Sequence, residues 1–296
     1  MTIDLFHGFR VHRTEVEGEG GAIHAVVGGD GPPVLLLHGH PQTHAMWHRV
    51  APVLARDYTV VCADLRGYGD SLKPRGGGDH SRYAKRRMAA DMVAVMADLG
   101  FQRFRLVGHD RGGRVAHRLA RDHRSTVSHL AVLDIAPTLA MYEATDRRFA
   151  TAYWHWFFLI QPEPLPETLL AGNPAAYLTT MLGRAGQGVI DPRALADYLR
   201  CNTTPDAIHA MCEDYRAAAS IDLDHDREDL AQPLTIPLLV LWGADGVVAR
   251  CFDPIEMWGA VALSVTGHAV PTGHYLAEED PDAVLAALVP FLATDG

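Results

Sequence analysis

The sequence of 296 residues is poor in cysteine and has no excess of basic residues. Its four cysteines, Cys62, Cys201, Cys212 and Cys251, are far apart and form neither a CxxC pair nor a zinc-binding spacing. This usage indicates free thiols in a reducing compartment. Lysine and arginine number 26 against 36 acidic residues, a net charge of −10, so nothing favours a nucleic-acid partner.

Long hydrophobic runs are also missing. No stretch stays apolar for the ~20 residues that a membrane-spanning helix needs. The first residues, Met1 to His7, carry neither the basic nor the apolar region of a secretory signal. We therefore expect a cytoplasmic, soluble protein without membrane contact. The chain length suits one large domain, or one domain with an insertion.

Short apolar runs recur along the chain, and helical patterns separate most of them. The runs cover residues 34–37, 59–63, 104–107, 130–133 and 238–241, with a last candidate at 263–265, and the helical patterns include 82–99 and 113–121. Residues 9–16 and 22–27 alternate around a glycine-rich turn and predict a hairpin. Continuous rather than alternating apolar runs predict an α/β fold with a mostly parallel central sheet flanked by helices. Its site should lie at the carboxyl ends of the strands.

Between residues 136 and 230 this rhythm stops. Helical segments rich in aromatic residues replace the strands, and Pro162, Pro164 and Pro166 interrupt them. We predict a core domain formed by residues 1–136 and 231–296. Residues 137–230 are predicted to form an inserted helical cap over the strand ends, and residues 73–79 a surface loop.

The segment Gly108-His109-Asp110-Arg111-Gly112 lies between a predicted strand and a predicted helix. Glycine on both sides of the central residue allows a sharp turn that exposes that residue at the end of the sheet. This is the nucleophile-elbow pattern with aspartate in place of serine. A carboxylate needs no base to attack a saturated carbon, where it displaces a leaving group and forms an ester. A glycine-rich turn with a solvated aspartate is the plainer alternative.

A late histidine follows the elbow, with an acid between them in the chain. The order Asp110, acid, His274 is that of the α/β-hydrolase triad, and His274 would activate the water that hydrolyses the ester. His268 is the nearest alternative base. Two acids end neighbouring strand candidates, Asp134 and Asp245, and we favour Asp134.

The sequence resembles the haloacetate (fluoroacetate) dehalogenases of the α/β-hydrolase superfamily over nearly its whole length. The matching stretches are residues 38–42, 64–69, 108–114, 153–156 and 214–217. The resemblance implies that Asp110 is the nucleophile, Asp134 the acid and His274 the base. It also implies an oxyanion hole formed by the backbone N–H groups of His40 and Arg111, and a homodimer.

The resemblance further assigns Arg111 and Arg114 to the substrate carboxylate, and His155, Trp156 and Tyr215 to the departing halide. A planar guanidinium fits a carboxylate and offsets the repulsion between two anions. Donors on apolar side chains suit a halide on which charge develops. Alternatively, the arginines lie on a helix surface and the aromatic residues pack within the cap.

The sequence therefore predicts a hydrolase that removes halide from short 2-haloacids and uses neither a cofactor nor a metal. Three features depart from the resemblance: His40 stands where phenylalanine is common, Asp245 is an additional acid, and the cap run 182–186 lacks a tryptophan. They leave open which haloacid and halide are preferred. One alternative is an epoxide hydrolase, which would need cap tyrosines and no arginine pair. Another is a non-catalytic binder of small acids with this fold.

Overall fold

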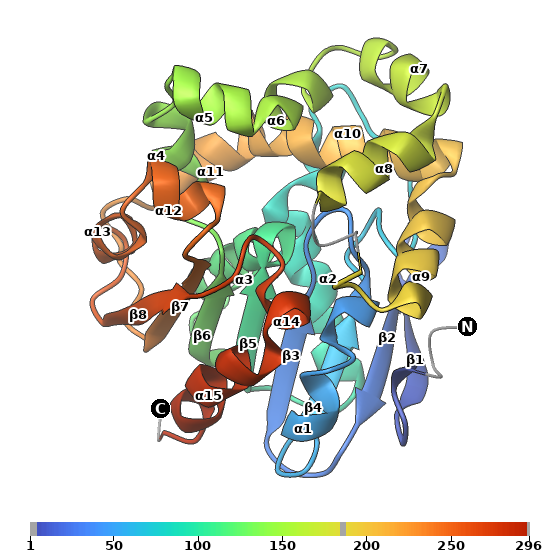
Figure 1. Ribbon diagram of the computed structural model, residues 1–296. Helices are drawn as coiled ribbons and strands as arrows, with labels where there is room; N and C mark the ends of the chain where they lie inside the picture. The colour runs from blue at the N-terminus through green and yellow to red at the C-terminus, as the bar shows by residue number, and fades with distance from the viewer. Residues whose placement is uncertain (1–4, 184–187, 295–296) are drawn as a thin grey trace.

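The computed structural model describes residues 5–183 and 188–294, and an eight-stranded sheet forms its centre (Figure 1). The strands lie in the order β1-β2-β4-β3-β5-β6-β7-β8. Strand β2 is antiparallel to both of its neighbours, and all other pairs are parallel. The strands are β1 (Arg10–Val16), β2 (Gly21–Gly28), β3 (Pro33–Leu37), β4 (Thr59–Ala63), β5 (Phe104–His109), β6 (Val127–Leu133), β7 (Leu238–Gly243) and β8 (Val265–Val270). The α/β fold and the N-terminal hairpin are confirmed.

The apolar runs form central strands because both faces of the sheet are covered. In β3, Leu35 and Leu37 pack against helices α2 (Lys85–Asp98) and α3 (Asp110–Asp122). The alternate residues Val34 and Leu36 face the other layer, which contains α1 (Ala51–Leu54) and α15 (Pro281–Leu292). Every residue of β6 is buried. A strand covered on both sides therefore shows no polar alternation.

The last strand is placed differently from the prediction. The apolar candidate at 263–265 is wrong for most of its length, because β8 begins at Val265 and continues to Val270. Leu263 lies before the strand with 72% of its surface exposed. Strand β8 is at the edge of the described sheet and pairs there only with β7, and one of its six residues is buried. An edge strand does not need the continuous apolar run that the sequence analysis relied on.

Helices replace strands between β6 and β7. They are α4 (Thr138–Glu143), α5 (Arg147–Ala152), α6 (Trp154–Leu159), α7 (Leu165–Ala171), α8 (Pro174–Leu182), α9 (Pro192–Asn202), α10 (Pro205–Ala218) and α11 (Ile221–Glu228). In Figure 1 helices α5 to α8 and α10 lie above one end of the sheet. We propose that residues 137–230 are the cap. Of the run 182–186, residues 184–186 lie outside the described residues.

The chain completes the sheet with short helices. These are α12 (Val247–Cys251), α13 (Pro254–Gly259) and α14 (Leu276–Glu279), together with the 3-10 turns η2 (His44–Trp47) and η3 (Ser81–Tyr83). Residues 73–79 contain neither helix nor strand and end in a turn, as predicted for this surface loop. All four cysteines are free thiols. In the described part of the chain, no helix is both long and apolar enough to cross a membrane.

Candidate active site

Asp110 lies at the junction of β5 and α3 with a positive φ of 46°. This left-handed conformation is rare for a residue with a side chain and marks a strained turn. The turn closes so tightly that a Cβ on Gly108 would lie 2.5 Å from the Gly112 carbonyl oxygen. A Cβ on Gly112 would lie 2.4 Å from the His38 carbonyl oxygen. The two glycines are thus required by close backbone approach, as a nucleophile elbow needs.

His274 faces Asp134 at the end of β6. Its Nδ1 donates to Asp134 Oδ2 over 2.6 Å, and the Gly243 N–H donates to Asp134 Oδ1 over 2.9 Å. Because a carboxylate accepts this bond, Nδ1 carries the proton and Nε2 is left as an acceptor. Asp245 is exposed on the loop after β7, and His268 is exposed on β8. The geometry therefore pairs His274 with Asp134. The alternative acid, Asp245, and the alternative base, His268, are not part of this hydrogen-bonded pair.

The electrostatics keep the nucleophile ionised. Burial alone would raise the pKa of Asp110, but the charges of His274, Arg111 and Arg114 outweigh it and hold this pKa below its usual range. For His274, burial would lower the pKa, but the hydrogen bond and charge of Asp134 raise it. An ionised carboxylate can attack without a base, and a histidine held by an acid can accept a proton from water.

A cavity of about 250 Å³ opens at Asp110 and is enclosed by both the core and the helices above it. It is lined by His40, Asp110, Ala152, Tyr153, Trp154, His155, Thr180, Met181, Tyr215, Val247, His274 and Tyr275. The structure thus brings Asp110, His274, His155 and Tyr215 together, as the sequence analysis predicted. The same analysis did not single out Tyr153 or Tyr275. A larger cavity of about 490 Å³ lies elsewhere, and none of the predicted site residues lines it.

Arg111 is held by an acid that the sequence analysis did not assign to the site. Its Nε donates to Asp214 Oδ2 over 2.7 Å and its Nη2 to Asp214 Oδ1 over 2.8 Å. The guanidinium also lies 4.1 Å from the centre of the Tyr215 ring. Among the described residues, its buried Nη1 has no hydrogen-bond partner. Only this nitrogen of Arg111 remains for a ligand.

Arg114 is buried next to Arg111 and its contacts differ. Its Nη1 donates to Thr138 Oγ1 over 2.8 Å, and its guanidinium lies 4.6 Å from the Trp156 ring centre. Within the described chain, the Nε of Arg114 and the Nε1 of Trp156 are buried without acceptors. His155 lines the cavity, and burial lowers the pKa of its imidazole to about 3, so the ring is neutral. Of the residues predicted to contact substrate or halide, His155 and Tyr215 line the cavity, whereas Arg111, Arg114 and Trp156 are not among its lining residues. Buried donors without partners are costly unless an acceptor comes within reach.

The loop after β3 contributes a backbone donor. The His40 N–H donates to Asp110 Oδ1 over 2.9 Å. The N–H of Arg111 belongs to the first turn of α3, where helical N–H groups have no partner within the helix. The His40 side chain lines the cavity with its Nε2 3.2 Å from the Tyr177 hydroxyl. Burial lowers the pKa of His40 to about 4, so this ring is neutral as well.

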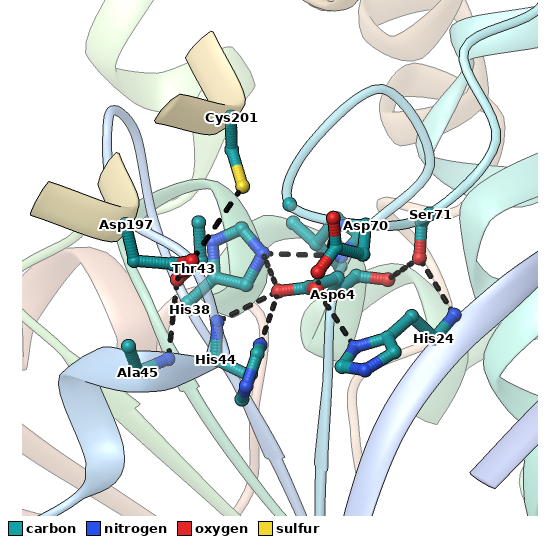
Figure 2. Close-up of polar contacts among 12 residues, drawn as sticks. His24, His38, Thr43, His44, Ala45, Asp64, Asp70, Ser71, Asp197 and Cys201 are labelled. Atoms are coloured by element: carbon teal, nitrogen blue, oxygen red, sulfur yellow. Dashed lines mark hydrogen bonds and ion pairs between the residues drawn. The ribbon is translucent and has the colours of Figure 1, made fainter. Parts of the chain in front are cut away.

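Figure 2 shows how Asp64, the residue after β4, anchors this loop. Its buried carboxylate accepts bonds from the His44 N–H at 2.8 Å, His44 Nδ1 at 2.9 Å and His24 Nδ1 at 3.0 Å. Nearby, His38 Nε2 accepts the Leu65 N–H over 3.1 Å. These bonds fix both ends of the loop that carries the His40 N–H.

Asp64, His24 and His44 lie close enough together to hold a metal ion. In this structure both imidazoles instead use Nδ1 to hydrogen-bond the carboxylate. Gly69 also packs on Asp64, where a Cβ would lie 2.0 Å from Cγ. The motif from Asp64 to Gly69 thus forms a hydrogen-bonded support for the neighbouring loop.

Comparison with known proteins agrees with this geometry. A family model of the alpha/beta hydrolase fold matches residues 32–281. The chain is 46% identical to a fluoroacetate dehalogenase of a Burkholderia species, covering 98% of this chain and 95% of that protein. It is 35% identical to a soluble epoxide hydrolase of Corynebacterium sp. (strain C12), covering 99% of each. The crystal structure of an alpha/beta hydrolase from Nostoc sp PCC 7120 matches with a TM-score of 0.95 at 51% identity, covering 98% of this chain and 100% of that one.

The chain therefore belongs to the α/β-hydrolase superfamily and, within it, to the haloacetate (fluoroacetate) dehalogenase family of hydrolases.

Proposed function

We propose that this hydrolase removes halide from short 2-haloacids such as haloacetates, with Asp110 as nucleophile, Asp134 as acid and His274 as base. The observation that carries the proposal is a set of buried donors beside an ionised carboxylate. Arg111 Nη1 and Arg114 Nε have no acceptor within the described residues. Unpaired buried donors are costly unless a ligand satisfies them. A small carboxylate anion fits this requirement.

The first chemical step is displacement at the saturated carbon. One Asp110 carboxylate oxygen attacks the carbon that carries the halogen, an oxygen–carbon bond forms, and the carbon–halogen bond breaks. The halide leaves with the bonding electron pair. Arg111 and Arg114 hold the substrate carboxylate, which offsets the repulsion between two anions and aligns the attack. The donors of His155, Trp156 and Tyr215 stabilise the charge that develops on the halide.

The second step hydrolyses the ester. His274 Nε2 takes a proton from water, and the resulting hydroxide attacks the carbonyl carbon of the Asp110 side chain. The backbone N–H groups of His40 and Arg111 stabilise the oxyanion of the tetrahedral intermediate. When this intermediate collapses, the bond between the Asp110 carbonyl carbon and the substrate oxygen breaks, and the His274 imidazolium returns its proton to that oxygen, so that the 2-hydroxyacid leaves. The regenerated Asp110 carboxyl group releases its proton to solvent. Asp134 keeps His274 in the tautomer that presents Nε2 to water. The proposed steps use protein side chains, backbone N–H groups and one water molecule, and none of them calls for a cofactor.

An epoxide hydrolase remains a second candidate, because two tyrosines of the helical insertion, Tyr153 and Tyr215, line the cavity. Such hydroxyls could protonate an epoxide oxygen, and a relative of 35% identity is a soluble epoxide hydrolase. The buried pair Arg111 and Arg114 has no role with a neutral epoxide. This difference favours the haloacid.

The experiment compares halide release from fluoro-, chloro- and bromoacetate with diol formation from a panel of epoxides. A His274→Ala variant is then incubated with bromoacetate and analysed by mass spectrometry. We expect a stable glycolyl ester on Asp110 and none in the matched Asp110→Asn variant. Diol formation without halide release would assign the epoxide hydrolase. Absence of both products would leave only a small-acid binder.

A further inference from the structure

Asp214 lies on α10 and contacts two cations of the core. Its fully buried carboxylate takes two bonds from Arg111, is also contacted by the Lys85 ammonium, and accepts the Tyr68 hydroxyl over 2.7 Å. Arg111 Nη2 additionally donates to the Asp214 carbonyl oxygen over 2.8 Å. The planar guanidinium is therefore fixed by three bonds to one residue. Its fork faces Asp214 instead of the cavity.

This arrangement prevents an ion pair between Arg111 and Asp110, which are adjacent in the sequence. Arg111 directly follows the nucleophile Asp110, and a free guanidinium beside a carboxylate forms a two-bond ion pair with it. A nucleophile bound in that way would be less reactive, and its partner would be unavailable to substrate. In the described structure, the Asp110 carboxylate accepts a hydrogen bond from the His40 N–H and none from a guanidinium. Asp214 binds the Nε and Nη2 atoms of Arg111, which would otherwise be able to pair with the Asp110 carboxylate.

We infer that Asp214 is a positioning residue. It holds the Arg111 fork away from Asp110 and leaves Nη1 as the one donor of Arg111 without a partner in the described residues, available to the substrate carboxylate. The inference rests on the proposed function. The inference also gives Arg111 and Arg114 different roles. Arg111 is paired with Asp214, whereas Arg114 forms no ion pair with a carboxylate in the described residues. Arg114 thus supplies the unpaired positive charge, and Arg111 supplies a directed hydrogen bond.

The neighbouring Asp222 offers a matched control. It accepts the Lys85 N–H over 2.8 Å, and its carboxylate lies 3.4 Å from the Lys85 ammonium. Like Asp214 it is a buried acid of this cluster, but it makes no hydrogen bond or ion pair with Arg111 in the described structure. An effect that arises only from loss of a buried charge should appear in both Asp→Asn variants. An effect transmitted through Arg111 should appear only for Asp214.

The test is a double-mutant cycle on kcat/KM for bromoacetate. We expect Asp214→Asn to lower kcat/KM on the order of ten- to a hundredfold, the scale of one hydrogen bond to a charged group. Arg111→Gln should cause a similar loss. The double variant should be no worse than Arg111→Gln alone, because Asp214 acts only through Arg111. Losses that multiply in the double variant would overturn the inference.

Asp222→Asn should change kcat/KM less than about threefold, and Asp214→Glu should fall between the wild type and Asp214→Asn. Equal losses for Asp222→Asn and Asp214→Asn would also contradict the inference. If Asp214→Asn does not fold, as judged by circular dichroism, the cycle is run with Asp214→Glu. That side chain keeps its charge but displaces the carboxylate by one methylene group. It should then lower activity in the wild-type background and leave Arg111→Gln unchanged.

The proposed function can be disproved independently of the inference about Asp214. A folded wild type that releases no bromide would disprove it. The wild type, Asp214→Asn, Arg111→Gln and the double variant are then compared by their Kd for acetate, measured by calorimetry. Non-additive affinities would still assign the positioning role to Asp214, and additive affinities would refute it.

Discussion

At the scale of single residues, the choice between two acids rests on one hydrogen bond. His274 donates to Asp134 over 2.6 Å, whereas Asp245 is exposed and its N–H donates to the Thr272 carbonyl oxygen. Only an acid bonded to Nδ1 can fix the tautomer that water activation needs. The exposed Asp245 carboxylate makes no hydrogen bond to His274 in the described structure. This assignment is a prediction of the geometry and can be tested directly.

We predict that Asp134→Asn accumulates the Asp110 ester, because His274 loses the partner that orients it. Rapid-quench mass spectrometry with bromoacetate measures the ester, and steady-state bromide release should fall at least a hundredfold, on the order seen when a catalytic histidine loses its acid. Asp245→Asn is the matched control and should turn over nearly as the wild type does. The reverse pattern would move the acid to Asp245.

The pH dependence of kcat follows from the hydrogen-bonded pair of His274 and Asp134. Burial lowers the pKa of His274, but the hydrogen bond and charge of Asp134 raise it, and these two contributions persist when Asp110 is esterified. Water activation needs the neutral ring, so kcat should fall as the pH drops through this raised pKa. Displacement by Asp110 should persist there, since its pKa lies below the usual range. Acid conditions should therefore trap ester in the wild type. A kcat that stays constant from pH 8 to pH 5 would contradict the role of His274.

At the scale of elements, buried strands could be predicted from the sequence and contacts between distant segments could not. The runs ending at Ala63, Leu133 and Leu241 are apolar because the sheet is covered on both faces, and each was found. The edge strand β8 was misplaced, since exposed side chains carry no apolar signal. In the site, Asp110 and His274 were recognisable from motif and order. Asp214 was not, because only folding brings α10 against the start of α3.

Glu278 on α14 joins three elements and predicts a pH-dependent stability. Gln42 of the loop after β3 and Tyr198 of α9 both hydrogen-bond its carboxyl group. Burial raises the pKa of Glu278 from 4.5 to about 7 despite these bonds. The folded state thus keeps a proton that the unfolded chain loses above pH 4.5. The stabilisation is complete below that pH and is lost as the pH rises through the folded-state pKa.

We therefore expect the free energy of unfolding of the wild type to fall by about 3 kcal/mol relative to Glu278→Gln between pH 4.5 and 7. Urea unfolding of both proteins across this range measures the difference, and glutamine provides a side chain that does not titrate. The comparison concerns the slope with pH, so a constant offset between the proteins does not affect it. Parallel curves would show that Glu278 has an ordinary pKa.

At the scale of the whole molecule, the helical insertion and the core share their interior. Ala210 and Ala217 of α10 belong to the same buried cluster as the strands and α3. Leu182 and Tyr198 belong to the cluster on the opposite face of the sheet. A third buried cluster, which includes Phe149, Trp156 and Met211, lies mostly within the insertion. The predicted division at residues 136 and 231 therefore separates two sequence patterns that share part of their buried surface. The homodimer and the cytoplasmic location stay predictions, of which light scattering tests the first.

Ion pairs also join the helical insertion to the core. They lead to a prediction of how the molecule unfolds. Asp214 of α10 is bonded to Arg111 and Lys85 of the core, all three being buried. Detaching the insertion would break these buried ion pairs and expose to water the apolar side chains that α10 shares with the core. The helices above the sheet should therefore not detach as an independent unit. We predict a single cooperative transition for the entire chain.

Hydrogen exchange followed by mass spectrometry, in increasing urea, tests this prediction. Peptides from α10 and from β5 should lose protection at the same urea concentration, and Asp214→Asn should lower both midpoints together. Earlier loss of protection in α10, with β5 still protected, would show that the insertion opens by itself. In that case the site would be assembled by closure of the helices over Asp110. With a common transition, the donors for the substrate carboxylate are already in place before substrate arrives, because the same ion pairs that hold α10 to the core hold Arg111.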